Sequence, residues 1–172
     1  MPCRPLATKG AEKMQVGIVG LGLIGGSMAK AVKAYTLHPV LGMDQSPQVQ
    51  EQALAEGAVD GILDRSSLSR CQLLLLALYP KAAVEFLIQY AGSIGKKAWI
   101  VDLCGVKQPV CDAARPLAES QGFYFVGGHP MAGKERSGYG ASCQDLFQGS
   151  SMLLTPDDTI PRQVLAELED FF

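Results

Sequence analysis

A short glycine-rich segment, GLGLIG at residues 20–25, constrains the fold of this chain more than any other feature. It follows a β-branched apolar run at residues 14–20 and precedes a stretch in which Met28, Val32 and Tyr35 recur at helical spacing. A strand that turns through glycines directly into a helix is the arrangement that holds the pyrophosphate of a dinucleotide. The alternative is a glycine-rich turn in some other α/β protein, which the flanking strand and helix disfavour.

Each glycine of this segment has a separate physical role. Gly20 permits a tight turn, Gly22 lets the backbone approach the pyrophosphate, and Gly25 lets the helix pack close to the sheet. The first helical turn, at Leu23 and Ile24, supplies free amides and a partial positive charge for the anion. We therefore expect these five residues to bind the cofactor.

The rest of the chain alternates apolar runs with amphipathic stretches. This alternation predicts an α/β, Rossmann-type, doubly wound fold with a mostly parallel sheet and helices on both faces. Ser46-Pro47 is a helix start signal, and Gly57 suits the end of that helix. We expect one nucleotide-binding domain over residues 14–172, with strands at residues 14–20, 39–44, 61–63, 72–78, 98–103, 122–126 and 150–155. The core-facing residues expected in three later helices are Val84, Leu87, Ile88 and Ala91; Val106, Val110 and Leu117; and Ile160, Val164, Leu168 and Phe171.

An acidic residue follows the glycine segment at the distance that dinucleotide recognition needs. Asp44 ends the second expected strand, about 20 residues further on, where its carboxylate can accept both hydroxyls of a ribose. Its charge would repel a 2′-phosphate, and Gln45 rather than an arginine follows it, so NAD is expected in preference to NADP. Leu78, Tyr79 and Pro80 end the fourth strand and are expected beside the cofactor, although a plain strand-to-helix turn fits them equally well.

Composition excludes several classes of partner. A formal net charge of −2 gives no reason to expect nucleic acid or an anionic membrane. The longest apolar run, residues 73–79, is far shorter than the roughly 20 residues that span a bilayer. Residues 1–13 carry scattered charges without an apolar stretch, which excludes a secretory signal and predicts a disordered leader. Five dispersed cysteines predict neither disulfides nor a zinc site, so we expect a cytoplasmic protein without a metal.

The two histidines occupy different settings. His38 lies between a helix and a strand, where a solvated side chain is the simpler expectation. His129 follows the sixth strand in an irregular glycine-rich segment, residues 127–149, that faces the cofactor crevice. A neutral imidazole there could accept a proton from an alcohol as hydride leaves its carbon. From these residues alone, a catalytic base and a structural histidine stay equally open.

Several motifs together resemble the prephenate and arogenate dehydrogenases. The segment GGHPMAG at residues 127–133, continuing to Glu135, is similar to the signature of this family. VGLGLIGGS at residues 19–27 resembles its cofactor segment, and DLCGVK at residues 102–107 falls where the family has Asp-x-x-Ser-Val-Lys. LLTP at residues 153–156 resembles the final strand of its nucleotide domain. The likeness covers nearly the whole chain, and the histidine motif is its specific part.

The resemblance implies NAD-dependent oxidative decarboxylation in tyrosine biosynthesis, of prephenate to 4-hydroxyphenylpyruvate or of arogenate to tyrosine. By that pattern His129 contacts the ring hydroxyl of the small-molecule substrate and takes its proton, and Glu135 belongs to a polar network at the pocket mouth. Gly105 is expected at the substrate and Asp102 at the cofactor. Because a protonated histidine cannot act as the base, activity is expected to fall below roughly pH 6.5.

Two departures from the family pattern matter. Gly105 stands where the family has a serine that helps to orient the histidine, so Cys104, a water molecule or the backbone would have to substitute. The family also continues into a helical domain that forms a homodimer and supplies an arginine for a substrate carboxylate, a role that Arg136 cannot be assigned. The terminal rings of Phe171 and Phe172 would fray at a chain end, so we expect a longer natural protein and an inactive fragment.

Two other interpretations stay open. β-Hydroxyacid dehydrogenases and related imine reductases have similar glycine segments, although they do not account for residues 127–133. A non-catalytic NAD-binding module, used for regulation or assembly, would also fit a chain of this length. Turnover of prephenate or arogenate by the full-length protein would distinguish an enzyme from such a module.

Overall fold

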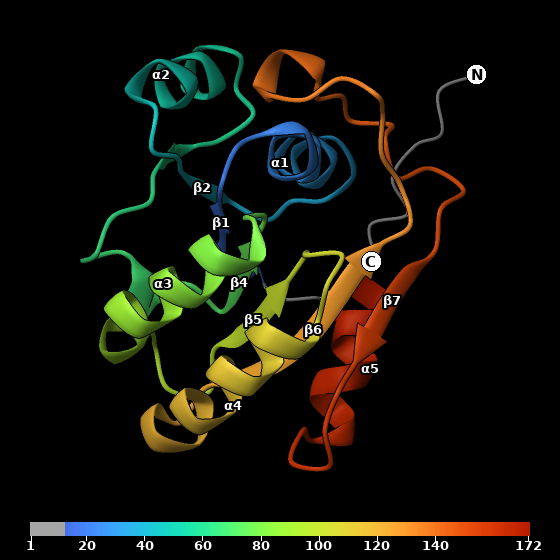
Figure 1. Ribbon diagram of the computed structural model, residues 1–172. Coiled ribbons are helices and arrows are strands. Elements are labelled where there is room, and N and C mark those ends of the chain that lie inside the picture. The colour runs from blue at the N-terminus through green and yellow to red at the C-terminus, as the bar shows by residue number, and fades with distance from the viewer. Residues whose placement is uncertain (1–12) are drawn as a thin grey trace.

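The computed structural model describes residues 13–172, so the leader expected at the N-terminus lies almost wholly outside the described residues. A seven-stranded sheet carries helices on both faces, which confirms the predicted fold class (Figure 1). The strands are β1 (Val16–Val19), β2 (Val40–Met43), β3 (Gly61–Ile62), β4 (Leu73–Leu76), β5 (Trp99–Asp102), β6 (Tyr124–Pro130) and β7 (Met152–Thr155). The helices are α1 (Leu23–Tyr35), α2 (Pro47–Ala55), α3 (Pro80–Tyr90), α4 (Gln108–Gln121) and α5 (Arg162–Phe171), with short 3-10 turns η1 (Leu68–Arg70), η2 (Ala91–Ser93) and η3 (Tyr139–Ala141).

The strand order places a binding crevice at one point of the sheet. The order is β3-β2-β1-β4-β5-β6-β7, and every neighbouring pair is parallel except β6 with β7. The chain winds from β1 outward to β3 and then returns to β4 on the other side of β1. In open α/β sheets, ligands bind at the carboxyl ends of the strands where the winding reverses in this way. The glycine segment leaves β1 at this point.

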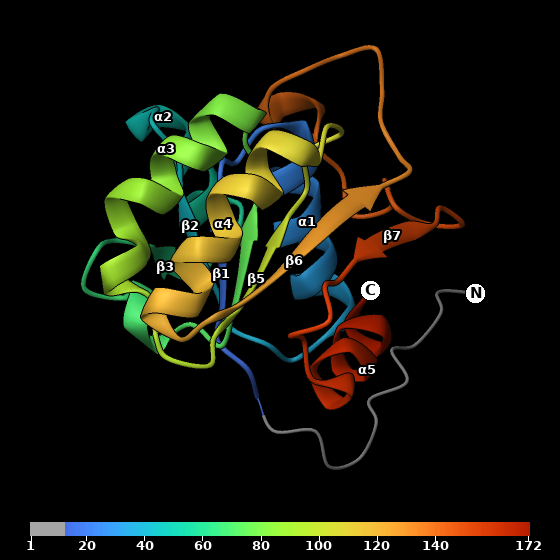
Figure 2. The same ribbon diagram turned by 60° about the horizontal axis from the view of Figure 1, so that its bottom comes forward.

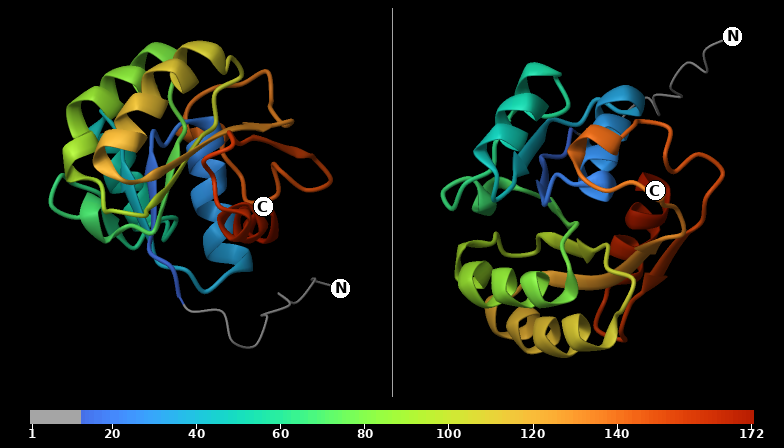
Figure 3. Two further views of the ribbon diagram at one scale, coloured as in Figure 1. Left: turned by 90° about the horizontal axis from the view of Figure 1, so that it is seen from below. Right: turned by 45° about the horizontal axis from the view of Figure 1, so that its top comes forward.

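The sheet separates two apolar cores. On one face α1, α2 and α5 pack against it through residues such as Met28, Val32 and Leu168. On the other face α3 and α4 contribute Phe86 and Val110 (Figures 2 and 3). Strands β1 and β4 are buried along their whole length, as continuous apolar runs predict for the centre of a parallel sheet. None of the described helices is both long and apolar enough to cross a membrane.

Local signals predict several element ends correctly, and two core assignments are wrong. The Ser46 hydroxyl accepts a hydrogen bond from the Val49 amide at 3.4 Å and caps α2, and Gly57 follows that helix with a φ of 69°.

Ile88 is 67% exposed because α3 turns its other side to the sheet. Val106 is 60% exposed because it lies in the loop before α4 begins.

Three differences arise from contacts between distant segments. Strand β6 continues through Pro130, so His129 lies inside a strand and the irregular segment begins later than expected. Antiparallel pairing with β7, which places His129 opposite Leu153, extends the strand. His38 is half-buried rather than solvated: its Nδ1 accepts a hydrogen bond from the Met14 amide at 3.1 Å, and burial lowers its pKa. Its ring stacks on Phe171 with centroids 6.0 Å apart, so the terminal helix is packed at its end.

Candidate active site

A cleft of about 1180 Å³ runs along the carboxyl edge of the sheet, above β1 and β4. It brings together most of the residues that the sequence singles out. The predicted residues that line it are Gly20, Gly22, Leu23, Ile24, Asp44, Leu78, Tyr79, Pro80, Gly105 and Glu135. Three others, Gly25, Asp102 and His129, are not among the residues that line it.

The fold itself requires two of the three glycines. Gly20 has a φ of 87°, and a Cβ there would lie 2.5 Å from the Ala77 carbonyl oxygen. A Cβ on Gly25 would lie 1.8 Å from the Gly20 carbonyl oxygen, so only glycine lets α1 start this close to the end of β1. These two positions therefore shape the turn and the packing of the helix, as the glycine pattern predicts.

Gly22 differs from the other two because the fold leaves it free. Its φ is −70°, and nothing lies within 4 Å of a Cβ built on it. It is the N-cap of α1, yet no side chain caps the helix and no acidic residue occupies the first turn. Within residues 13–172 no side chain accepts from the first amides of this helix, and the helix start lines the cleft, which fits a bound phosphate group.

Asp44 holds the glycine segment and also lines the cleft. One carboxylate oxygen accepts a hydrogen bond from the Leu21 amide at 2.8 Å, and the other accepts one from the Ser46 amide at 2.9 Å. The side chain thus ties the glycine segment to the start of α2. Each carboxylate oxygen can accept a further hydrogen bond, so both remain able to receive a ribose hydroxyl.

Tyr79 stands at the opposite wall of the cleft. It is the N-cap of α3, followed by Pro80 at the first helical position, as the strand-to-helix signal predicts. Its side chain is 84% exposed, which is unusual for a large aromatic residue next to a core strand. The ring is therefore available to a ligand rather than used in packing.

His129 is oriented by the backbone. Its Nδ1 lies 3.2 Å from the Cys104 carbonyl oxygen. A carbonyl only accepts hydrogen bonds, so Nδ1 carries the proton and Nε2 keeps the lone pair that a base needs. The Cys104 thiol instead donates to the Leu78 carbonyl at 3.1 Å, and burial, followed by the nearby Asp102 charge, raises its pKa to about 12. The backbone thus supplies the orienting contact that a serine at position 105 would otherwise share.

Gly105 lines the cleft and lies next to His129. A Cβ at this position would lie 3.3 Å from the imidazole Cε1, which is tighter than an ordinary contact. The imidazole therefore packs against a residue of the cleft wall. A substrate hydroxyl at this wall of the cleft would lie near the histidine.

Asp102, which the family pattern places at the cofactor, has a fully buried side chain and is not among the residues that line the cleft. It pairs with Lys107, whose Nζ also donates to the Gly128 carbonyl oxygen next to His129. One carboxylate oxygen, Oδ1, has no hydrogen-bond partner among the described residues. Sequence reasoning did not single out Lys107, although it ends the same six-residue motif.

The cleft also contains charged residues, of which the sequence motifs indicate only Glu135 and Asp44. Glu135 lines it and is exposed, and no hydrogen bond or ion pair joins it to another residue between 13 and 172. Arg65, Lys134 and Arg136 line the same cleft and bring positive charge to it. These residues come from loops after β3 and β6, where periodicity carries no information about side-chain direction.

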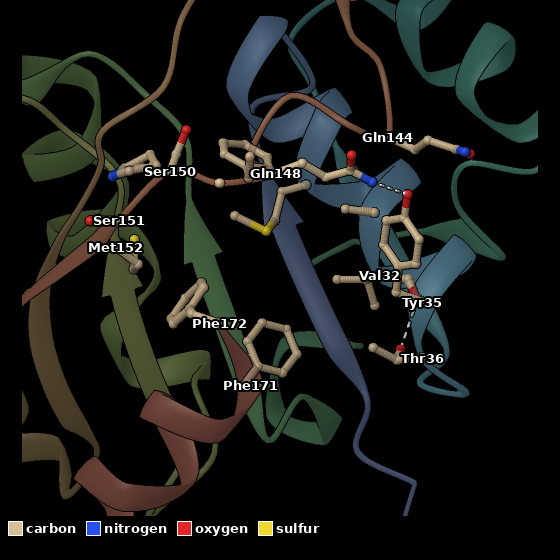
Figure 4. Close-up of a pocket in the computed structure, with 15 residues that line it drawn as sticks. Val32, Tyr35, Thr36, Gln144, Gln148, Ser150, Ser151, Met152, Phe171 and Phe172 are labelled. Carbon is tan, nitrogen blue, oxygen red and sulfur yellow. Dashed lines mark hydrogen bonds between the residues drawn. The ribbon is translucent and has the colours of Figure 1, made fainter. Parts of the chain in front are cut away.

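A second cavity, of about 380 Å³, lies between the far half of α1 and the end of α5 (Figure 4). Phe171 and Phe172 face it from one side, and Tyr35 and Gln148 face it from the other. None of the predicted cofactor or catalytic residues lines this cavity. The cleft at the sheet edge is therefore the candidate active site.

Comparison with known proteins gives a consistent family. A family model described as the prephenate dehydrogenase nucleotide-binding domain matches residues 28–172. The prephenate dehydrogenase of Bacillus subtilis is 34% identical over 159 residues, which are 89% of this chain and 42% of the relative. The cyclohexadienyl dehydrogenase of Zymomonas mobilis is 31% identical over 160 residues, which are 91% of this chain and 54% of the relative.

Solved structures agree with these relatives. Synechocystis arogenate dehydrogenase superposes with a TM-score of 0.84 at 28% identity, and the matched region covers 91% of this chain and 55% of the arogenate dehydrogenase chain. The prephenate dehydrogenase of A. aeolicus in complex with hydroxyphenyl propionate and NAD+ has a TM-score of 0.84 at 25% identity. The matched region covers 94% of this chain and 57% of that chain. The chain thus spans about half the length of the relatives it matches.

Proposed function

Because this chain belongs to the prephenate dehydrogenase family, as its nucleotide-binding domain, we propose that it binds NAD in the cleft and supplies the base for oxidative decarboxylation of prephenate. One arrangement supports the proposal: the uncapped start of α1, Asp44 and Gly105 line a single cleft, and His129 lies next to Gly105. The negative charge of Asp44 favours NAD over NADP. The reaction would take place in the cytoplasm on a small-molecule substrate.

The proposed reaction balances without a further reagent. The substrate ring carries a hydroxyl group and a carboxylate at opposite carbons. Bound NAD would supply the acceptor for the hydride that leaves the carbon bearing the hydroxyl group. The hydroxyl proton moves to Nε2 of His129, and the carboxylate leaves as carbon dioxide while its bonding electrons make the ring aromatic. The phenolate oxygen then takes the proton back, so the imidazole ends neutral.

The chain's own residues would divide this work. The α1 amides and Gly22 would hold the pyrophosphate, and Asp44 would accept the ribose hydroxyls. Tyr79 would cover one face of the bound cofactor. The Cys104 carbonyl would keep the proton on Nδ1 and so leave Nε2 basic in every turnover.

Cofactor binding by this chain is the first test. Calorimetric titration should give an affinity for NAD at least tenfold higher than for NADP. Asp44→Asn should narrow that ratio, because the amide keeps an acceptor oxygen but loses the charge. Glu85→Gln removes an exposed carboxylate from the same cleft and should leave the ratio unchanged. Tighter binding of NADP than of NAD would contradict the role of Asp44.

Turnover must be measured in full-length protein, for which we infer a second, helical domain and a homodimer. Prephenate and arogenate should be compared as substrates, since an arogenate dehydrogenase is among the similar structures. His129→Asn should reduce kcat by at least a hundredfold, within the range that a general base contributes, about 10²–10⁴-fold. Equal rates before and after this substitution would exclude His129 as the base. No turnover of either substrate would favour a non-catalytic NAD-binding module.

A further inference from the structure

Residues 131–143, here called the strap, cross from the end of β6 to the side of α1 (Figures 1 and 2). The first part of the strap, residues 134–138, lines the cleft. The second part contains η3 and packs on α1. Beyond the strap, Gln148 donates to the Tyr35 hydroxyl at 2.9 Å and fastens the returning chain to the far end of α1 (Figure 4).

The strap fits closely against the second turn of α1. Tyr139 is only 3% exposed. A Cβ on Gly26 would lie 2.8 Å from the Tyr139 ring and 3.0 Å from the Ser142 side chain, so only glycine allows this approach. The Ser27 side chain is fully buried, and its hydroxyl oxygen accepts a hydrogen bond from the Cys143 amide at 3.0 Å.

A polar network closes the outer side of this contact. The Tyr139 hydroxyl donates to Glu56 at 3.0 Å, and Lys30 forms an ion pair with the same carboxylate at 3.1 Å. The Lys30 ammonium also lies 4.5 Å from the centre of the Tyr139 ring and donates to the Ser142 carbonyl at 3.4 Å. Burial and the bond to Glu56 raise the pKa of Tyr139, so its hydroxyl keeps the proton that it donates. Groups from α1 and α2 therefore hold one buried ring.

The docked strap determines where its cleft residues lie. Lys134 donates to the Ala141 carbonyl at 3.3 Å and contacts the Cys143 sulfur at 3.0 Å, so its charge is fixed by the docked part of the same strap. Gly138, with a φ of 85°, turns the chain between the cleft part and the docked part. Gly26 and Ser27 do not line the cleft themselves. The three atoms nearest to a Cβ on Gly26 all belong to the strap, and the Ser27 hydroxyl bonds to its last residue.

We propose that Gly26, Ser27 and Tyr139 are positioning residues, which dock the strap on α1 and thereby hold residues 134–138 as the outer wall of the cofactor cleft. The second glycine of the Gly25-Gly26 pair is then required by the strap and not by the cofactor. This inference rests on the proposed function for its ligand, since the wall encloses the site assigned to NAD.

Gly26→Ala tests the proposal, because the added methyl group favours helix formation yet collides with Tyr139. We expect NAD affinity to fall at least tenfold and hydrogen exchange at the Cys143 amide to become at least tenfold faster, measured by calorimetry and by NMR. Gly140→Ala is the matched control: it lies in the same strap, and a Cβ there meets nothing within 4 Å. It should leave both quantities within twofold of the original chain.

A double variant separates positioning from folding. Tyr139→Ala removes the closer of the two collisions, so Gly26→Ala should lower the thermal midpoint less in a Tyr139→Ala background than in the original chain. NAD affinity should nevertheless stay low, because the strap has lost its anchor. Recovery of affinity together with stability would overturn the proposal.

Two further outcomes are decisive. Unchanged NAD affinity in Gly26→Ala, with faster exchange at Cys143, would show that the strap docks but does not serve the cofactor, and would overturn the proposal. If the original chain does not bind NAD, the proposed function fails first. The rate of hydrogen exchange at the Cys143 amide then tests only whether the strap docks on α1. Faster exchange in Gly26→Ala supports the docking, and unchanged exchange overturns it.

Discussion

Alanine substitutions at Gly25 and Gly22, three residues apart, should affect different properties. Gly25→Ala should lower the stability of the fold, and Gly22→Ala should lower the affinity for the cofactor. Gly25→Ala places a Cβ 1.8 Å from the Gly20 carbonyl oxygen and 2.9 Å from the Ala77 Cβ. Gly22→Ala places it in open space at the mouth of the cleft. The first substitution therefore opposes the packing of α1, and the second opposes only a ligand at the helix start.

The expected magnitudes follow from these contacts. Overpacking costs about 1–3 kcal/mol, and the upper end applies to Gly25→Ala because the nearest atoms belong to the backbone. Alanine recovers up to about 1 kcal/mol of helix propensity, which leaves a net loss of about 2 kcal/mol. For a chain of this size that loss lowers the thermal midpoint by about 4–8 °C. Gly22→Ala replaces one weak N-cap residue by a poorer one and should cost at most about 1 kcal/mol.

Thermal unfolding followed by circular dichroism, with calorimetric NAD titration, distinguishes the two variants. Gly22→Ala should melt within a few degrees of the original chain yet bind NAD at least tenfold more weakly, a loss of about 1.4 kcal/mol. Gly25→Ala should lose stability measurably. A Gly25→Ala variant that melts with the original chain would refute the packing argument. A Gly22→Ala variant with full affinity would refute the position assigned to the pyrophosphate.

Two further predictions concern buried and half-buried charges. Lys107→Met leaves the Asp102 carboxylate buried without its cation, so the free energy of unfolding, measured in urea, should fall by about 3–5 kcal/mol. Adding Asp102→Asn should recover most of that loss. If nothing is recovered, the pairing of Asp102 with Lys107 is contradicted. Hydrogen bonds from Gln52 and Lys30 lower the pKa of Glu56, so its contribution to stability is present above the unfolded pKa and is lost as the pH falls through the folded value. Glu56→Gln should therefore lose less thermal stability than the original chain between about pH 5 and pH 3, and parallel pH profiles would contradict this.

Much of the fold follows from patterns that are local in the sequence. Local signals predict three features correctly, because propensity, capping and periodicity agree there: the start of α2 at Ser46-Pro47, the buried strand β4 and the turn at the glycine segment. What the sequence did not reveal depends on partners far along the chain. The extension of β6 to His129 needs β7, and the packing of His38 needs both Met14 and the last helix.

The candidate site shows the same division. The sequence named His129 but left open what would orient it, since a backbone carbonyl has no signature in the amino-acid letters. The motif that contains Asp102 does not indicate that its carboxylate is fully buried and pairs with Lys107. A motif predicts which residues belong to a site, but burial depends on the packing of distant segments.

The glycines at residues 20–26 show most clearly which positions the fold requires and which it leaves to a ligand. Gly20 and Gly25 are fixed by atoms of the fold, and Gly26 by the strap, so a protein without any cofactor would still need them in this structure. Among the glycines at residues 20–26, only Gly22 meets no atom within 4 Å, and its φ is ordinary, so nothing within the described residues requires it to be glycine. A glycine that the fold does not need, at an uncapped helix start on a cleft, is explained by a ligand that takes the missing space. The nucleotide is thus best inferred from the one glycine of the segment that the protein's own packing leaves unexplained.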